Sequence, residues 1–224
     1  MVRGTFGIVA FLLAQSVPAA AEPQTPSPAG QDRASPFMRV HGPTKPPYGF
    51  VRFCVESPQE CVRGPLEPAR FTLTADRLKE ADEINRIVNT RITAATDKDV
   101  YGVEEYWTLP VDRGDCEDYA LLKRHLLVAR GWPASALLMT VVRDEKGEGH
   151  AILTLRTAQG DFILDNKVNE IRAWSRTPYV YVMRQSYIDP MVWVSLDDQT
   201  GAPPGLIAGV RRVSAGAAGD ASRR

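Results

Sequence analysis

Hydrophobic residues recur at steps of three and four in one polar segment, at Leu78, Ala81, Ile84, Val88 and Ile92. This spacing puts them along one side of an α-helix, so residues 74–92 are predicted to form an amphipathic helix. Thr74 can cap its first turn, and Asp76 lies where a negative charge favours the helix dipole. The pattern therefore predicts a helix that packs one side on a core.

A second helix is predicted over residues 116–130, where apolar residues again gather on one side. Gly131 and Pro133 then stop the helix, because glycine favours the conformation that follows a helix end and proline cannot continue a helix. The apolar side consists of Ala120, Leu121, Leu127 and Val128. Residues 100–110, between the two helices, are aromatic without a period, which indicates an irregular loop over the core.

After residue 135 the apolar pattern changes from helical to extended. The predicted strands are 136–142, 150–155, 162–164, 179–183 and 192–194. A polar loop over 144–149 and a turn around 158–160 separate the first three strands, as in an antiparallel meander. Helices followed by such strands indicate an α+β domain, with N-terminal helices packed on an antiparallel β-sheet.

The two ends of the chain differ in composition from this folded body. Arg3, a short apolar run and the small residues up to Ala21 are typical of a cleaved signal peptide over residues 1–21. The apolar run is too short for a retained membrane anchor. A Pro-rich linker arm over 22–45 and a disordered tail over 199–224 are predicted, which leaves a folded domain over 46–198.

Charge excludes two classes of partner. Lys and Arg number 27 and Asp and Glu also number 27, so the formal net charge is zero. Without a basic block, nucleic acid and anionic lipid are poor candidates for partners. No later segment is apolar enough to span a bilayer, so the mature chain is expected to be soluble, either in the periplasm or outside the cell.

Three cysteines are present, and export changes how they are interpreted. Cys54 and Cys61 lie close together, and in an oxidising compartment they are expected to form a disulfide around Ser57-Pro58. The alternative is two free thiols. Either way Cys116 has no obvious partner, and a lone exported thiol suggests a use, although buried inert cysteines are also common.

Cys116 lies at the predicted start of the second helix, in the sequence Gly-Asp-Cys-Glu-Asp-Tyr-Ala. A helix N-terminus carries unpaired N–H groups and a partial positive charge, which stabilise a thiolate. The acids Asp115, Glu117 and Asp118 oppose it, because like charges disfavour ionisation of the thiol. Either the acids cap the helix, or they bind a divalent cation such as Ca²⁺. From these residues alone, capping is favoured.

His150 and Asp165 complete a candidate catalytic set. His150 begins a strand after a Gly-containing loop, and Asp165 ends the next strand. A hairpin with a two-residue loop at Gln159-Gly160 would place His150 opposite residue 169. This is an even number of positions from Asp165, so both side chains share one face of the sheet. Each residue alone is equally compatible with a structural role at a strand end.

This order of residue types predicts nucleophilic catalysis. His150 would take the proton from Cys116, Asp165 would orient the imidazole, and the thiolate would attack a carbonyl group. Backbone N–H groups would hold the oxyanion. Trp107 is a further candidate for the pocket or the oxyanion site, with a lid packed on the core as the alternative.

Several segments together resemble the bacterial transglutaminase-like cysteine proteinases, over about residues 46–196. They are Asp97-Lys-Asp-Val-Tyr-Gly102, Tyr106-Trp107, Gly114 to Ala120 with Lys123, His150 to Leu153, Leu164-Asp-Asn166, and Cys54 with Cys61. The resemblance implies a papain-like/transglutaminase core with Cys116, His150 and Asp165 as its triad. It also implies that Asp115, Glu117 and Asp118 match calcium-binding positions, which makes calcium and capping equal alternatives.

The combined prediction is an exported cysteine endopeptidase that forms a thioester acyl-enzyme. The family that this chain resembles includes periplasmic proteases that release adhesins. The expected partner is therefore a protein substrate, such as a cell-surface or periplasmic protein. Two alternatives stay open. A transglutaminase-type acyltransferase would use the same triad with an amine in place of water. A binding module would keep the fold without turnover.

Overall fold

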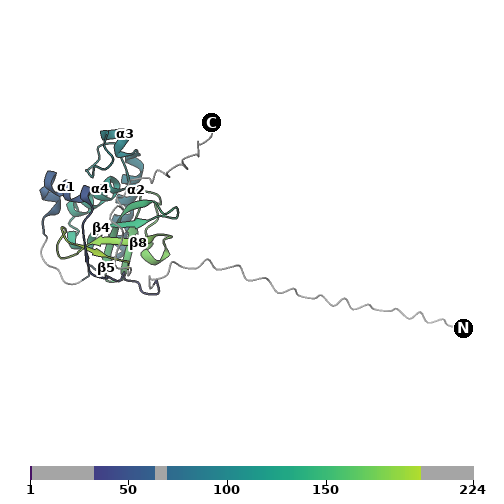
Figure 1. Ribbon diagram of the computed structural model, residues 1–224. Helices are drawn as coiled ribbons and strands as arrows, with labels where there is room; N and C mark the ends of the chain where they lie inside the picture. The colour runs from purple at the N-terminus through teal and green to yellow at the C-terminus, as the bar shows by residue number, and fades with distance from the viewer. Residues whose placement is uncertain (2–32, 64–69, 198–224) are drawn as a thin grey trace, which may run out of the picture.

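The computed structural model describes residues 33–63 and 70–197, together with Met1. Apart from Met1, the expected signal peptide (1–21) lies outside these residues, as does the expected tail (199–224). Among the residues described, no helix combines the length and apolar character needed to cross a bilayer. The helices gather on one side of a central sheet, as Figure 1 shows.

Within residues 33–63 and 70–197, seven antiparallel strands form the central sheet, in the order β1-β9-β8-β4-β5-β6-β7. They are β1 (Pro43–Thr44), β4 (Leu137–Arg143), β5 (Gly149–Thr157), β6 (Gly160–Leu164), β7 (Arg172–Ala173), β8 (Val180–Gln185) and β9 (Trp193–Ser195). The five predicted strands correspond to β4, β5, β6, β8 and β9. The two-residue strands β1 and β7 lie at the edges and were too short to leave a sequence pattern.

In the described part of the chain, four α-helices and three short 3-10 helices accompany the sheet. They are α1 (Tyr48–Glu56), α2 (Ala75–Arg91), α3 (Asp97–Tyr101), α4 (Cys116–Ala129), η1 (Pro58–Cys61), η2 (Ala134–Ala136) and η3 (Trp174–Arg176). Helix α4 packs on β5, and α2 packs on α4. The two predicted helices are thus confirmed as α2 and α4, and Thr74 Oγ1 caps α2 by accepting from the N–H of Arg77 at 3.2 Å.

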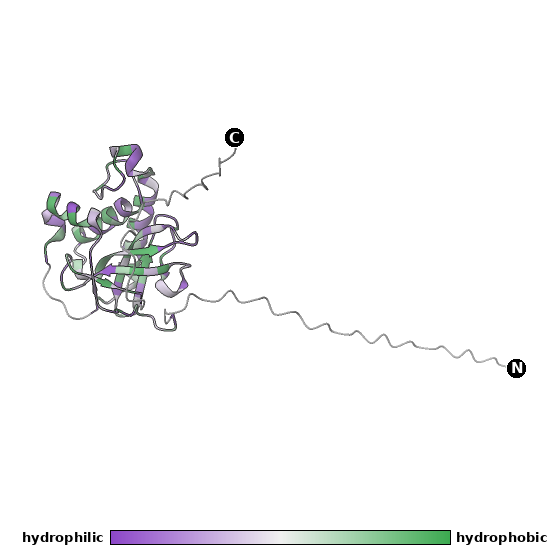
Figure 2. Ribbon diagram, viewed as in Figure 1, coloured by the Kyte–Doolittle hydropathy of each residue, from purple (hydrophilic) through white to green (hydrophobic). Residues whose placement is uncertain are grey.

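Alternation along the strands divides the apolar residues between two cores. Ala151, Leu153 and Leu155 of β5 pack against the helices, whereas Ile152 belongs to a second core on the other face of the sheet. The central strands carry mostly hydrophobic residues (Figure 2). Because side chains alternate along a strand, His150 lies on the same face as Ile152. The α+β class expected from the sequence is confirmed.

The described part of the Pro-rich arm, residues 33–45, is packed on this second face. Met38 is buried in the second core, and its N–H donates to Asp161 Oδ2 at 2.8 Å. The N–H of Asp161 donates in turn to the carbonyl of Pro36 at 2.9 Å, and β1 pairs with β9. The folded body therefore begins well before residue 46, because backbone groups of the arm find partners on the sheet.

Helix α1 and the disulfide complete the helical side of the molecule. Cys54 in α1 and Cys61 in η1 are joined by a disulfide, as the sequence predicted. Helix α1 itself was not predicted. Its residue Gly49 lies so close to the Trp107 ring that a Cβ atom there would be 2.3 Å from Trp107 Cδ1. Phe50, Phe53 and Cys54 give α1 a short buried side at helical spacing, but its packing also depends on this tertiary contact at Gly49, which the sequence does not reveal.

A small parallel pairing fixes the chain just before Cys116. Strand β2 (Thr93–Ala94), which follows α2, pairs with β3 (Arg113–Gly114). The N–H of Ala95 also donates to the carbonyl of Gly114 at 2.9 Å. The start of α4 is thereby tied to the end of α2, which positions the side chains at residues 115–118.

Candidate active site

Cys116 is the first residue of α4, and its sulfur faces the start of strand β5. The residue is half-buried, and Sγ accepts a hydrogen bond from the N–H of Ala151 at 3.3 Å. Strand β6 does not reach this point, because the last β5–β6 pair is Leu153 with Leu164. The N-terminus of α4 thus approaches β5 where β6 has ended, at Ala151, the residue that follows His150 in the chain.

His150 and Asp165 are joined as expected from their shared face. His150 Nε2 and Asp165 Oδ1 are 2.9 Å apart, and both side chains are almost fully buried. The carboxylate accepts from Nε2, so the proton of a neutral ring lies there and Nδ1 carries the lone pair. Burial alone would raise the pKa of Asp165, but the bonds from His150 and Tyr179 lower it to about 2.

The hairpin loop begins one residue earlier than was assumed for the sequence, which shifts the pairing by two positions. Thr157 pairs with Gly160, so the two-residue loop is Ala158-Gln159 instead of Gln159-Gly160. This shift brings Asp165 two positions closer to the place opposite His150. The offset between them stays even, so the shared face was independent of the exact turn.

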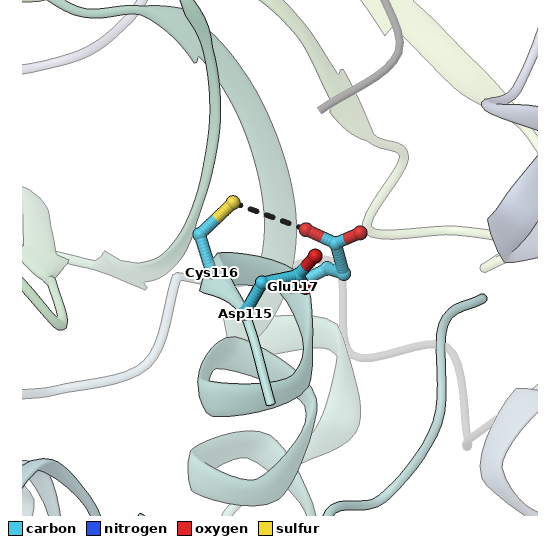
Figure 3. A group of neighbouring side chains, drawn as sticks. All are labelled: Asp115, Cys116 and Glu117. Carbon is cyan, nitrogen blue, oxygen red and sulfur yellow. Dashed lines mark hydrogen bonds between the residues drawn. The ribbon is translucent and has the colours of Figure 1, made fainter. Parts of the chain in front are cut away.

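The thiol proton itself is engaged elsewhere. Cys116 Sγ donates to Glu117 Oε2 at 3.0 Å, as Figure 3 shows. Within the described chain, no hydrogen bond joins Sγ to the His150 ring, and Nδ1 of that ring has no hydrogen-bond partner. Burial raises the pKa of Cys116 well above its usual value, and the carboxylates of Glu117 and Asp115 raise it further. The acids beside Cys116 therefore hold the thiol in its protonated form.

Helix α2 holds the segment that carries Asp165. Asn89 Nδ2 donates to the carbonyl of Asp165 and to Asn169 Oδ1, both at 2.8 Å. One turn earlier, Asn85 Nδ2 donates to the carbonyl of Asn169 at 2.9 Å. Sequence reasoning missed both asparagines, although their spacing of four on one helix was visible. Asn89 thus fixes the backbone of Asp165 through its carbonyl group, and Asn85 fixes the loop that follows at Asn169.

Five carboxylates gather at the start of α4, two more than the sequence suggested. Asp97 and Glu105 join Asp115, Glu117 and Asp118, and ligand oxygens of Asp97, Asp115 and Asp118 all lie within 4.8 Å of one another. The same separation holds for Asp97, Glu105 and Glu117. Asp97 stood in a segment quoted for the family resemblance, whereas no signal in the sequence singled out Glu105.

Each of these carboxylates keeps one buried oxygen without a hydrogen-bond partner. The atoms are Asp97 Oδ1, Glu105 Oε2, Asp115 Oδ1, Glu117 Oε1 and Asp118 Oδ2. The opposite oxygens of three of these residues accept from Tyr106 N–H, Trp107 Nε1 and Thr108 N–H. Buried oxygens normally find partners, and five unsatisfied ones at a single place match the oxygen donors that a hard cation prefers.

Helix capping accounts less well for these acids. Asp115 stands at the N-cap position of α4, but its side chain makes no capping hydrogen bond. Glu117 and Asp118 are fully buried, whereas acids that merely favour a helix dipole lie at the surface. Of the two interpretations left open by the sequence, cation binding fits these observations better.

Crowding of the acids changes their ionisation. Burial, followed by repulsion from Asp115, raises the pKa of Asp97 to about 6. Burial likewise raises the pKa of Glu105 and of Asp118 to about 8 each. In the absence of a cation, the folded protein therefore keeps protons on these groups at a pH where the unfolded chain has lost them.

A family model described as "Bacterial transglutaminase-like cysteine proteinase BTLCP" matches residues 40–201. The chain belongs to the bacterial transglutaminase-like cysteine proteinase family. This protein is therefore a cysteine peptidase, a hydrolase with a transglutaminase-like fold of helices on an antiparallel sheet. The resemblance that the sequence motifs suggested is confirmed.

Solved structures of LapG from Legionella pneumophila are similar to part of this peptidase. The calcium-bound LapG is 26% identical over 52% of this chain and 68% of that chain, with a TM-score of 0.45. The EGTA-treated LapG is 28% identical over 48% and 62%, with a TM-score of 0.41. At these TM-scores, no individual residue of this chain is assigned a counterpart in LapG. No curated protein sequence matches the chain.

Trp107 does not lie free in the pocket of this peptidase. It is 1% exposed, its Nε1–H donates to Glu105 Oε1 at 2.6 Å, and its ring packs against Phe50 and Trp193. The indole donor is thus already used, so the oxyanion role expected for Trp107 is replaced by a packing role. Its contact with Glu105 helps to form the carboxylate cluster instead.

Without added calcium, this peptidase is expected to lose stability as the pH rises from 5 to 7. Asp97, Glu105 and Asp118 have folded pKa values above their ordinary ones, so the folded state binds more protons than the unfolded state across this range. The free energy of unfolding then falls with pH. Melting temperatures in EGTA at pH 5 and pH 7 measure the effect.

The expected fall in stability is limited to pH values below 7, because burial lowers the pKa of Lys123 to about 7. Above this pH the folded state binds fewer protons at Lys123 than the unfolded state does, so this residue makes stability rise with pH. Asp118→Asn removes one of the titrating groups and should make the fall smaller. A melting temperature that rises between pH 5 and pH 7 in EGTA would contradict the description of the cluster.

Proposed function

We propose that this protein is an exported cysteine endopeptidase that cleaves a protein substrate through Cys116, His150 and Asp165. One observation carries the proposal. The buried bond between His150 Nε2 and Asp165 Oδ1 lies next to the Ala151 N–H on which the Cys116 sulfur rests. A nucleophile beside an imidazole that a carboxylate orients is the arrangement that acyl transfer through a thiol requires.

The proposed reaction begins with proton transfer from Cys116 to His150. The bond to Asp165 keeps the ring proton on Nε2, so Nδ1 is the base that takes the thiol proton. The thiolate attacks the substrate carbonyl carbon, and the tetrahedral intermediate collapses as the C–N bond breaks. His150 gives its Nδ1 proton to the leaving amine. Water, deprotonated by the same nitrogen, then hydrolyses the thioester and restores the thiol.

Charge that develops on the carbonyl oxygen needs donors near Cys116. The N–H of Cys116 opens α4, where the first N–H groups have no partner within the helix. We assign this backbone N–H to the oxyanion, in place of Trp107. The partial positive charge of the helix start supports both the oxyanion and the thiolate.

The carboxylate cluster is proposed to hold Ca²⁺, with Asp97, Glu105, Asp115, Glu117 and Asp118 as ligands. Calcium takes six to eight oxygen ligands, and this cluster offers five carboxylates with one unpartnered oxygen each. A bound Ca²⁺ would supply positive charge that favours the Cys116 thiolate. Glu117 is central to this proposal, because it is both a proposed ligand and the acceptor of the thiol proton.

Gly114 provides a way to disturb the proposed ligands without changing any charge. A Cβ atom on Gly114 would lie 2.4 Å from Asp118 Oδ2, so Gly114→Ala must displace that carboxylate. We expect this variant to bind Ca²⁺ at least about 10-fold more weakly, as loss of support around a metal ligand typically does. Isothermal titration with CaCl₂ measures this, and an unchanged affinity would remove Asp118 from the ligand set.

Export is proposed because residues 1–21 have the composition of a signal peptide. A protein substrate is proposed as the partner because the proposed reaction cleaves a protein. The disulfide between Cys54 and Cys61 supports export, because disulfides form and persist in oxidising compartments such as the periplasm. A protein of the periplasm or the cell surface would then be the substrate. The unit that acts on it is the folded domain, expected over residues 46–198 and extended by the packed arm.

Cleavage products test the proposed function directly. Extracytoplasmic proteins are incubated with the wild-type protein or with Cys116→Ala, in CaCl₂ and a fluorescent primary amine. New protein N-termini that appear only with the wild type support the peptidase. Fluorescent amine incorporated without new N-termini would replace it with an acyltransferase, and identical mixtures would favour a binding module.

A further inference from the structure

Tyr179, the residue before β8, contacts both His150 and Asp165. Its hydroxyl donates to Asp165 Oδ2, and its ring makes an edge contact with the imidazole, with centroids 5.5 Å apart and planes inclined by 66°. The residue is 3% exposed. Sequence reasoning treated it only as the start of a strand.

The bond from Tyr179 completes the surroundings of Asp165. Oδ1 of Asp165 is shared by His150 Nε2 at 2.9 Å and the N–H of Lys167 at 3.0 Å. Oδ2 has the Tyr179 hydroxyl. Both oxygens are therefore engaged, so rotation of the carboxylate about the Cβ–Cγ bond of Asp165 would break a hydrogen bond. Loss of a hydrogen bond to a charged carboxylate is costly in a buried site.

We propose that Tyr179 is a positioning residue of the active site, which fixes the Asp165 carboxylate through its hydroxyl and the His150 imidazole through its ring. The proposal rests on the proposed catalytic function of His150 and Asp165. Tyr179 acts through these two residues. Its work is to keep the imidazole in the tautomer, and at the angle, that leaves Nδ1 as the base.

Loss of the hydroxyl would leave Asp165 beside an open space. A cavity of about 50 Å³ is bordered by Asp165, Tyr179, Thr177 and Glu145, among others. This volume admits water, which forms hydrogen bonds without fixing a direction. Removal of the Tyr179 oxygen would therefore replace a fixed donor by a mobile one, so the effect should be on orientation more than on charge.

Charged groups from other elements also face this pair. The carboxylate of Glu145, in the β4–β5 loop, raises the pKa of Tyr179 through its negative charge. The negative charge of Asp165 raises the pKa of Lys123 of α4, against the larger lowering by burial. Lys167 is drawn away by Asp144, with Nζ and Oδ2 2.8 Å apart. Burial, then the bond to Asp165, raises the pKa of Tyr179, so its hydroxyl remains a donor throughout the neutral range.

Tyr181 offers a matched control two residues further on. It is 1% exposed, and its hydroxyl is 2.9 Å from Thr177 Oγ1 and 3.2 Å from the carbonyl of Trp174. It therefore loses a buried hydroxyl in the same way when changed to phenylalanine, but the two bonds just described join its hydroxyl to Thr177 and Trp174. Any effect of Tyr179 that Tyr181 does not share belongs to the active site.

The first measurement is the rate at which iodoacetamide alkylates Cys116 at pH 6.5 in CaCl₂. We expect Tyr179→Phe to lower this rate about 10-fold and Tyr179→Leu about 100-fold, the range for a hydrogen bond to a charged group and then for loss of the ring as well. Tyr181→Phe should stay within about twofold of the wild type. Melting temperatures confirm that each variant is folded.

The second measurement is the ¹⁵N spectrum of the imidazoles in protein labelled at histidine. In the wild type, His150 should show one tautomer, with its proton on Nε2. In Tyr179→Leu both nitrogens should shift toward the average of two tautomers, whereas Tyr181→Phe should match the wild type. A general loss of stability does not produce this change at a single ring.

The outcomes separate this proposal from the one on which it rests. Wild-type spectra and wild-type alkylation in both Tyr179 variants would overturn the positioning role while leaving the triad intact. If Cys116 of the wild type reacts no faster than a free thiol, the proposed catalysis fails, and the tautomer of His150 still decides the role of Tyr179. If Tyr179→Leu does not fold, Tyr179→Phe decides by the same measurements.

Discussion

Replacement of His150 by alanine is expected to lower the rate at which iodoacetamide alkylates Cys116 by about 100-fold at pH 6.5 in CaCl₂, the lower end of the contribution of a positioned base. At this pH a thiol with its ordinary pKa is almost entirely protonated, so rapid alkylation requires a base that takes its proton. In the structure the only cysteine outside the disulfide is Cys116, so the reaction reports on one site. Mass spectrometry of the alkylated protein measures the rate.

His125 supplies the control for this experiment. It lies on the same helix as Cys116, is partly exposed, and its Nδ1 is 2.8 Å from Glu60 Oε1, away from the active site. His125→Ala should react like the wild type. Equal rates for the wild type and His150→Ala would show that the imidazole does not activate the thiol, and the peptidase proposal would lose its base.

Removal of calcium is expected to lower the melting temperature by about 5–10 °C and to suppress alkylation of Cys116. A ligand at about 100 times its dissociation constant stabilises by about 2.7 kcal/mol, and for a domain of this size each kcal/mol shifts the melting temperature by about 2–4 °C. The loss of reactivity follows because the unneutralised acids raise the pKa of Cys116. Calorimetry and alkylation in EGTA, before and after CaCl₂ is restored, measure both effects.

Two acids that are close in sequence provide a matched pair for the calcium experiment. Asp118 is fully buried in the carboxylate cluster, whereas Asp112 is exposed and outside it. Asp118→Asn should weaken the response to Ca²⁺, and Asp112→Asn should not. If neither the melting temperature nor the reactivity of the wild type responds to EGTA, the calcium site is wrong, although His150 and Asp165 keep their geometry.

The sequence predicted best where a local pattern carries the structure. The three- and four-residue steps of α2, with Thr74 at its cap, and the apolar strands from β4 onward each follow from neighbouring residues. The pairing of His150 with Asp165 needed only parity along two adjacent strands. An error of one residue in the hairpin loop left that parity unchanged, which is why the pair could be predicted without the exact register.

Features that depend on distant contacts were not predictable in this way. The carboxylate cluster needs Asp97, the first residue of α3, and Glu105, in the segment after α3, to lie at the start of α4. Helix α1 needs Gly49 to lie against Trp107, and the packed arm needs Met38 to lie under the sheet. None of these contacts has a period in the sequence. The sequence of the arm instead suggests a linker, because prolines are common in linkers as well as in extended arms that pack on a fold.

The distance from Cys116 Sγ to His150 Nδ1, in a crystal grown with CaCl₂, tests the central claim most directly. With calcium on the carboxylates, Glu117 should no longer hold the thiol proton. The sulfur should then lie within about 4 Å of Nδ1, the loose end of the range for a nucleophile and its base. A calcium-loaded structure in which the sulfur stays on Glu117, out of reach of the imidazole, would contradict the account.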